Sequence, residues 1–300
     1  MSLPPESRTP DAGVIHDIGY RGYTGPRLGR AHATRSLFVQ GLRAAFGLGR
    51  SGRSKVLPML VLAVLVLPAV VVVAFAVAQH ADELPLDYPD YLSAFGLVVE
   101  LFVAAQAPVL MSRDLRYNTV PLYFSRPITR GDYVRARFGA MAAAMLLLMA
   151  APLVVLYLGA MLGGMPPGHN TAHFLYGLVA AVLYALVFSA IGLLIAASTP
   201  RRGFGVAAVM GFLVVSLAVA AILYGLAGGG QSPVPASANW TALLSPGWLV
   251  EGLVTQLFGL GETSRALRAP GALGAVVFAA EAVLIVAGSY GLLRRRYRSI

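Results

Sequence analysis

The sequence predicts an all-α integral membrane protein, and three observations carry that prediction. Of its 300 residues, 57% are hydrophobic and 12% are charged, whereas about 25% of the residues in a soluble domain are charged. Several apolar runs reach about 20 residues, the length that a helix needs to cross a hydrocarbon core about 30 Å thick. Basic stretches fall in alternate connections between these runs. The formal net charge of +10 therefore reflects membrane topology rather than nucleic-acid binding.

The part of the chain ahead of the first span is predicted in two pieces. Residues 1–28 are rich in Pro, Gly and charge, which predicts a mobile cytoplasmic tail. Residues 29–55 are expected to hold an amphipathic helix at the membrane interface, because apolar residues such as Leu37 and Leu42 recur at helical spacing while Arg43 falls on another face. The arginines of this helix are expected near anionic headgroups.

Six membrane spans are expected within a transmembrane domain at residues 56–293. Pro68 interrupts the first apolar run and is expected to kink that helix. The spans are predicted at residues 56–78, 91–111, 138–162, 174–197, 204–226 and 273–293.

The positive charges orient these spans. All but two of the 23 Lys and Arg residues lie before the first span, in the loop at 111–137, after the fourth span or in the basic C-terminus at 294–300. The two exceptions, Arg265 and Arg268, lie on the other side. Because cytoplasmic loops carry the excess of Lys and Arg, we expect a multi-pass cell-membrane protein with both termini in the cytoplasm.

A short helix is expected on the outer side, within the connection at 228–271. Ser245 and Pro246 fit the N-cap and N1 positions of this helix. At about 14 residues it is too short to cross the membrane, so it is either a shallow interfacial helix or a staple against the outer ends of the spans. Glu251 and Thr255 are expected to turn away from its apolar face. That face is formed by Trp248, Leu249, Leu253, Leu257 and Leu260.

The polar loop between the second and third spans carries the strongest functional signal. Thr119 fits the N-cap of a short helix, whose apolar ridge ends in exposed aromatic side chains. A second helix start follows at Thr129, with Asp132 at capping-box spacing. A stiff basic projection of this kind is typical of a surface that a soluble partner binds. The alternative is an ordinary cytoplasmic loop, basic for topological reasons alone.

Three short motifs follow one another in this loop: Ser-Arg-Asp at 112–114, Thr-Val-Pro-Leu at 119–122 and Ser-Arg-Pro-Ile-Thr-Arg at 125–130, with Tyr133 after them. They resemble the loop that carries the coupling helix in type-2 ABC exporter permeases, the membrane subunits of ATP-binding-cassette transporters. That family usually has acidic residues after its Arg-Asp pair, where this chain has Arg116, Tyr117 and Asn118. By this resemblance, the residues that couple the permease to its ATPase are Thr119, Leu122, Tyr123, Phe124, Arg126, Arg130 and Asp132.

The resemblance also implies a working unit of two permease subunits, identical or related, and two cytoplasmic ABC ATPases. The chain has no Walker A motif, because its one lysine, Lys55, is followed by Val56. We therefore expect no enzymatic activity and no cofactor in this chain, with ATP bound by the partner subunit. The expected cargo classes are a lipid, a drug, a peptide or a glycoconjugate, and no motif chooses among them.

Two acidic residues within the spans are candidates for a role along a transport pathway. Glu100 and Glu281 both fall near the membrane midplane, where an ionised carboxylate costs several kcal/mol unless it is protonated, paired or hydrated. A protonated carboxyl bonded to a neighbouring group is the alternative for each. His169 and His173 have a spacing that metal sites use, but no further ligand accompanies them, and we predict no metal site.

Three functional classes fit these observations. We favour an ABC exporter permease that a separate ATPase powers. An ion-coupled secondary transporter would use Glu100 or Glu281, although no internal repeat relates residues 56–162 to residues 174–293, as it does in many such carriers. A membrane scaffold without transport activity is the third class. Co-purification of an ATPase would distinguish the first class from the others.

Overall fold

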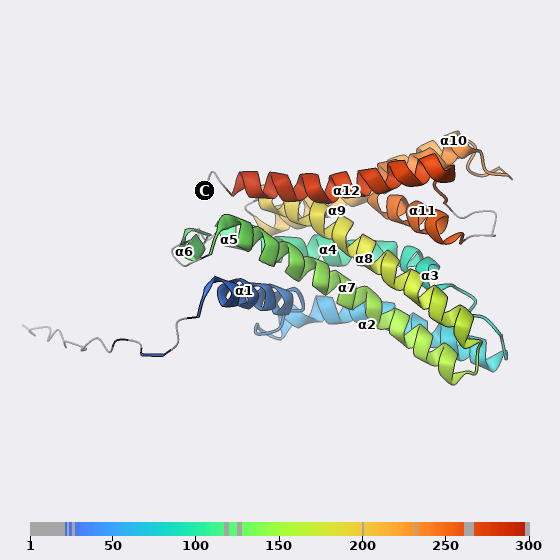
Figure 1. Cartoon of the computed structure of the whole chain (residues 1–300), viewed down its shortest axis with the longest axis horizontal. Coiled ribbons are helices and arrows are strands. Elements are labelled where there is room, and N and C mark those ends of the chain that lie inside the picture. The colour runs from blue at the N-terminus through green and yellow to red at the C-terminus, as the bar shows by residue number, and fades with distance from the viewer. Residues whose placement is uncertain are drawn as a thin grey trace, which may run out of the picture.

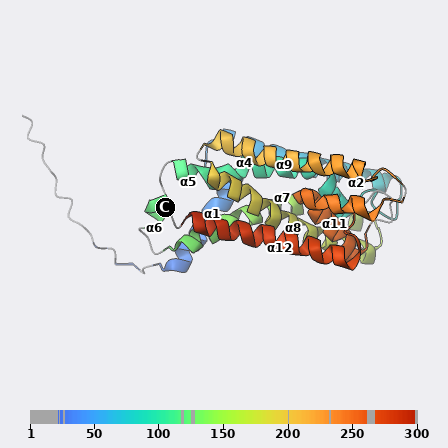
Figure 2. The same cartoon turned by 90° about the horizontal axis from the view of Figure 1, so that it is seen from above.

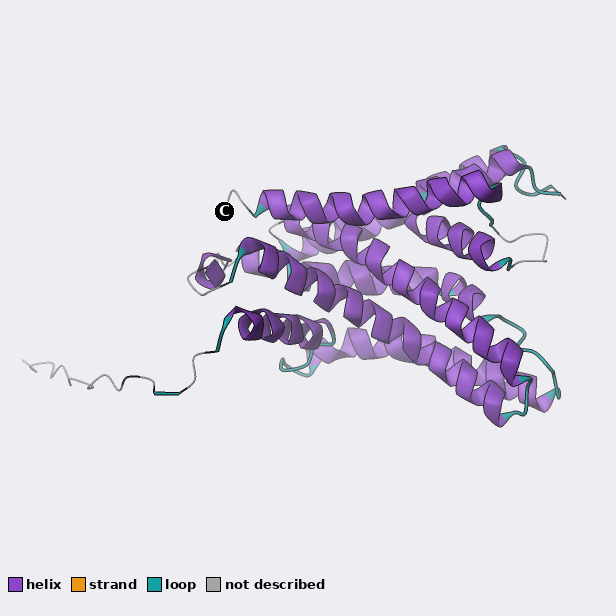
Figure 3. Cartoon of the chain, viewed as in Figure 1, coloured by secondary structure: helices purple, strands orange, loops and turns teal. Residues whose placement is uncertain are grey.

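The fold is described from a computed structural model, which describes residues 22, 24–25, 28–116, 120–124, 128–199, 201–231, 233–260 and 267–297. Every regular element within these ranges is a helix, as the colouring of Figure 3 shows, and this confirms the predicted all-α fold class. The predicted tail at 1–28 lies almost wholly outside the described residues, as do the last three residues of the basic C-terminus.

The helices follow the predicted order of apolar runs. They are α1 (Arg30–Ala45), α2 (Arg53–Ala78), α3 (Tyr88–Ala94), α4 (Gly96–Leu110), α5 (Ser112–Arg116), α6 (Val120–Phe124), α7 (Arg130–Leu162), α8 (Pro167–Ser198), α9 (Arg202–Leu226), α10 (Ala236–Asn239), the 3₁₀ helix η1 (Trp240–Leu244), α11 (Pro246–Phe258) and α12 (Gly271–Arg296).

Among the described residues, five helices are long and apolar enough to cross a membrane: α2, α7, α8, α9 and α12. The predicted second span corresponds to a bent pair of helices, α3 and α4, which meet at an angle of 61°. Counted as one span, this pair raises the number of candidate spans among the described residues to six. The bend has a local cause. Asp87 caps α3 by accepting a hydrogen bond from the backbone N–H of Tyr88, and Phe95 then leaves helical geometry before α4 begins at Gly96. The expectation of one straight second span at 91–111 is corrected accordingly.

The long helices run side by side in a bundle whose centre is α8. This helix packs against α7, α4, α9, α11 and α12. In contrast, α2, α9 and α12 lie at the periphery and expose large apolar side chains such as Leu67, Leu226 and Leu284. Apolar side chains on the outside of such a bundle are expected where lipid or another subunit covers them.

The two ends of the bundle differ in character. Figures 1 and 2 both show α1, α5, α6 and the C-terminal end of α12 gathered at one end, with α10 and α11 toward the other. Helix α1 lies against α7, and Gly41 permits this approach, because a Cβ at that position would lie 2.8 Å from Cβ of Ala140. The basic end of the bundle is therefore built from the N-terminal part, the middle and the C-terminal part of the chain.

A helix forms at the predicted outer position as α11, with Ser245 at its N-cap and Pro246 in its first turn. It packs against α8, α9 and α12 rather than lying over a single surface. For that reason Thr255, which was expected to turn away from apolar surroundings, is buried at 6% exposure. Gly259 ends the helix with a φ of 65°, a left-handed conformation that suits glycine.

Candidate functional site

The candidate site is the basic end of the bundle, where α5 and α6 lie between the predicted second and third spans. The beginning of α7 anchors this region. Thr129 is the N-cap of α7, and its side chain accepts a hydrogen bond from the backbone N–H of Asp132. Asp132 in turn accepts a hydrogen bond from the backbone N–H of Thr129 at 3.0 Å, so the predicted capping box is present. Two of the free N–H groups at the helix start are thereby satisfied.

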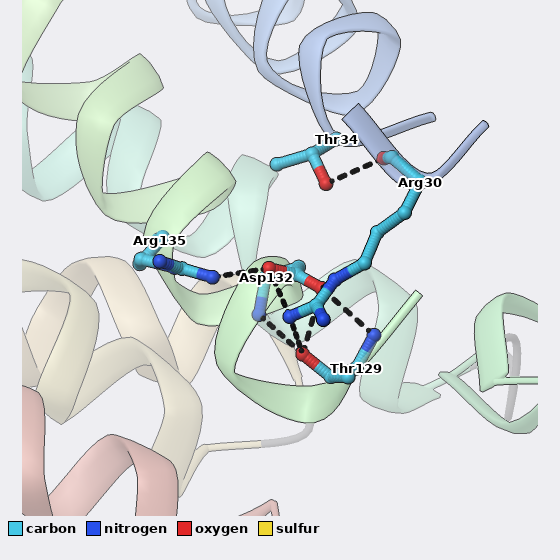
Figure 4. Close-up of polar contacts among 5 residues, drawn as sticks. All are labelled: Arg30, Thr34, Thr129, Asp132 and Arg135. Atoms are coloured by element: carbon cyan, nitrogen blue, oxygen red, sulfur yellow. Dashed lines mark hydrogen bonds and ion pairs between the residues drawn. The ribbon is translucent and has the colours of Figure 1, made fainter. Parts of the chain in front are cut away.

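The Asp132 carboxylate also binds two arginines, as Figure 4 shows. The Arg30 guanidinium of α1 donates to it from Nε at 2.5 Å and from Nη2 at 3.0 Å. Arg135, one turn further along α7, donates to the same carboxylate. The side chain of Asp132 is 3% exposed. A single buried carboxylate thus joins the start of α1 to the start of α7.

A second ion pair holds α5 against α7. The Arg137 Nη2 atom donates to Asp114 Oδ2 at 2.5 Å, and the Tyr133 hydroxyl donates to the same oxygen at 2.8 Å. Arg137 Nη1 donates to Oε1 of Gln40 in α1 at 2.9 Å. The Arg137 side chain is 3% exposed, and a charge buried to that degree depends on its partner, since removal of one member of such a pair costs about 3–5 kcal/mol.

Asp114, Tyr133 and Arg137 form a platform under α6, and aromatic side chains pack α6 onto it. The ring of Tyr133 lies 5.6 Å from the ring of Tyr123 and 6.3 Å from that of Phe124, between centroids. On its other side, the Tyr133 ring lies 5.1 Å from that of Tyr297, which follows α12. Burial raises the pKa of Tyr297 to about 12, so its hydroxyl stays protonated at neutral pH. The cluster therefore connects α6, α7 and the end of α12.

The orientation of α6 revises one expectation. Tyr123 and Phe124 were expected to be exposed, whereas both are half-buried against Tyr133. Leu122 is the side chain of α6 that reaches outward, with 67% of its surface exposed. Successive side chains on an α-helix point about 100° apart, so α6 cannot turn all three consecutive ridge residues outward. The two aromatic rings gain more from burial than leucine does. Arg130 lies with its guanidinium carbon 5.7 Å from the Phe124 ring centroid.

Two of the residues assigned to ATPase coupling, Thr119 and Arg126, lie outside the described residues. The other five are brought together at one end of the bundle. They are Leu122, Tyr123, Phe124, Arg130 and Asp132. Sequence reasoning missed Arg30, Asp114 and Arg137 as members of this site. For Arg137, its place directly before the long apolar run of α7 was a signal that it needs a partner.

The acidic residues within the spans do not meet one another. Glu100 of α4 is 4% exposed, and its Oε2 atom has no hydrogen-bond partner. Its Oε1 atom lies 3.8 Å from the position that a Cβ would take at Gly247, so Glu100 lies beside the start of α11. Glu281 is half-buried on α12. Glu251 was missed because it was placed on the outer face of a shallow helix, whereas α11 packs into the bundle.

The two histidines lie together in the first turns of α8. Their rings stack with centroids 3.9 Å apart, and Nδ1 of His173 lies 2.6 Å from Oδ2 of Asp87. This contact joins α8 to the N-cap of α3. Within the part of the chain that the structure describes, His, Cys, Asp and Glu side chains form no group of three that could hold a metal ion.

Comparison with known families bears on the larger part of the membrane domain. The profile of the family described as ABC-2 family transporter protein matches residues 52–217. The match covers more than half of the chain's 300 residues and runs from the start of α2 into α9, so it includes α5, α6 and the whole of α7. No curated protein matches the chain.

Proposed function

Since the chain belongs to the ABC-2 transporter family, we propose that it is the permease subunit of an exporter, which moves its cargo outward with energy from ATP hydrolysis in a separate subunit. Family membership implies association with an ABC ATPase subunit. The working unit of the proposal contains two permease subunits and two ATPases. The sequence contains no Walker A motif, so in this proposal the separate subunit binds and hydrolyses the ATP.

The packing of α6 against α7 is the observation that best supports the proposal. A permease that receives energy from a separate ATPase needs a rigid contact, because a loose loop would absorb the motion that hydrolysis produces. Helix α6 is short, yet Tyr123 and Phe124 pack on Tyr133, and Arg137 beneath them is held by Asp114. Leu122 projects from this platform. The basic end of the bundle is then the cytoplasmic end, in agreement with the positive-inside rule.

Substitution of Leu122 tests this contact. A residue that acts as a hot spot of an interface contributes about 2 kcal/mol or more, which corresponds to a roughly thirtyfold change in affinity, and the proposal assigns this part to Leu122. We expect Leu122→Glu to insert and fold as the parent does, but to lose most of the ATPase that co-purifies from native membranes. The matched control is Leu162→Glu at the end of α7, where the leucine is 90% exposed at the other end of the bundle. Equal ATPase recovery with both variants would contradict the proposed contact.

Glu100 is proposed to line the path of the cargo, since it is buried beside the start of α11 and its Oε2 atom has no hydrogen-bond partner. Glu100→Gln keeps the shape and the hydrogen bonding of the side chain but removes the charge. We expect stability to change by no more than about 1 kcal/mol, with ATPase association retained and export of a cationic cargo lost. Export of such a cargo at the parental rate would exclude Glu100 from the pathway. Glu281 is half-buried on α12, whereas Glu100 is only 4% exposed, so Glu281 has the weaker claim to this role.

A further inference from the structure

A basic cavity lies beside the start of α7, at the end of the bundle that carries α6. Its volume is about 490 Å³, and four arginines line it together with Thr129 and Tyr290. These arginines come from three helices. They are Arg30 of α1, Arg130 and Arg135 of α7, and Arg294 of α12.

The charge of this cavity is only partly neutralised. Asp132 forms ion pairs with Arg30 and Arg135. No carboxylate among the described residues forms an ion pair with Arg130 or Arg294. The Arg294 side chain lies beside the first turn of α7, with Nε 3.9 Å from the position that a Cβ would take at Gly131. A cavity with this excess of guanidinium groups favours an anion that accepts several hydrogen bonds, and phosphate has the geometry that arginine binds best.

An apolar groove begins where the basic cavity ends. It has a volume of about 340 Å³ and lies between α7, α8 and α12. Tyr290 lines both the cavity and the groove, and its ring packs edge-on against Phe138 with centroids 6.4 Å apart. The groove then follows one face of α12, past Val286 and Ala282. From Arg294 to Ala282 that face extends about 18 Å, at roughly 1.5 Å per residue.

From this continuity we infer that the cavity and the groove together bind one anionic phospholipid, whose phosphate lies among the arginines and one of whose acyl chains fills the groove. A length of about 18 Å matches one leaflet of a hydrocarbon core about 30 Å thick. Tyrosine at the junction suits the boundary between headgroups and acyl chains. Basic pockets between membrane helices on the cytoplasmic side are known to take anionic headgroups in other proteins. A free phosphate ion would leave the apolar groove unfilled.

Such a lipid would act as a structural ligand, because it contacts α1, α7 and α12 at the point where they surround the platform of α6. The inference does not depend on the transport activity proposed above. It requires only that the arginine cavity and the groove are accessible to lipid in the folded protein.

The headgroup half of the inference is tested with Arg294→Gln and its neighbour Arg295→Gln as the matched control. Arg295 is exposed at the same helix end but does not line the cavity. The purified protein is titrated with phosphatidylglycerol or phosphatidylcholine of equal chain length, and bound lipid is counted by native mass spectrometry. We expect preferential retention of phosphatidylglycerol, about fivefold weaker in Arg294→Gln and unchanged in Arg295→Gln. Equal retention of the two lipids, or equal loss in both variants, would overturn the inference.

The claim that an acyl chain occupies the groove is tested by filling the groove with a larger side chain. Ala287 lines the groove, whereas Leu284 lies on another face of α12 with 70% of its surface exposed. We expect Ala287→Phe to weaken binding of long-chain phosphatidylglycerol severalfold while Leu284→Phe does not. Binding of inorganic phosphate without any preferential retention of phosphatidylglycerol would mean that the cavity binds phosphate alone, and would overturn the inference. If Ala287→Phe left lipid retention intact but shifted the chain from dimer to monomer, the groove would be covered by a second copy, and the lipid site would be excluded.

Discussion

At the scale of single residues, the site depends on two carboxylates that each hold more than one partner. Asp132 serves as a cap for α7 and as the ion-pair partner of Arg30 and Arg135. Asp114 holds the buried Arg137 and the hydroxyl of Tyr133. Both carboxylates fix arginines near the membrane boundary, where an unpaired guanidinium would otherwise have to reach water. These three arginines at this end of the bundle are thus held in place by two carboxylates that are largely buried and ion-paired.

Asp114→Ala is expected to destabilise the protein by about 3–5 kcal/mol, because Arg137 would remain buried without its carboxylate. The measurement is thermal unfolding in detergent, with Asp82→Ala on an exposed connection as the control. The double variant Asp114→Ala with Arg137→Met should recover much of the loss, because it removes both charges together. A single variant no less stable than Asp82→Ala would show that the pair contributes little.

At the scale of secondary structure, polar residues rather than apolar runs decide where the important helices begin. Helix α7 starts at Arg130, well before the apolar run that begins near Phe138, because Thr129 and Asp132 cap it there. The capping box was readable from the sequence, since its two residues are local and their spacing is fixed. The early start lets α7 carry Tyr133 and Arg137 out of the apolar region and under α6.

Thr129→Ala tests this capping role. It removes the acceptor of the Asp132 backbone N–H and of a hydrogen bond from Arg30 Nη2, and we expect a loss of about 1 kcal/mol in unfolding free energy. Thr34→Ala is the control, because that exposed hydroxyl bonds only to the carbonyl of Arg30 one turn before it. Thr129→Ser should restore the parental stability. No difference between Thr129→Ala and Thr34→Ala would contradict the capping argument.

Other features of the elements could not be predicted from the sequence, and the reasons are physical. The bend between α3 and α4 arises where Phe95 leaves helical geometry within an otherwise apolar run, and hydropathy does not report that change. The burial of Thr255 follows from contacts of α11 with three other helices, which are long-range. Likewise, the inward turn of Tyr123 and Phe124 depends on Tyr133, one helix away. Local signals predicted that these helices exist, but tertiary packing determined which faces they bury.

At the scale of the whole molecule, the proposed function assigns two roles to opposite parts of the bundle. The basic end gathers α1, α5, α6 and the end of α12 (Figures 1 and 2). The half that holds α11 contains the buried Glu100, which lies beside the start of α11. Rigid helices such as α7 and α8 connect the two regions over their whole length. An exporter permease of the proposed kind needs this arrangement, in which a contact for the ATPase at one end can move a path for the cargo at the other.

The most direct test of the central claim is site-specific cross-linking from α6 in native membranes. The chain has no cysteine, so single cysteines at Leu122 and Leu162 can each carry a thiol-linked photo-crosslinker without background. We predict that position 122 captures a subunit with a Walker A sequence, identified by mass spectrometry, and that position 162, at the opposite end of α7, captures none. Capture of the ATPase at neither position, or equally at both, would contradict the assignment of α6 as the contact through which ATP hydrolysis drives this permease.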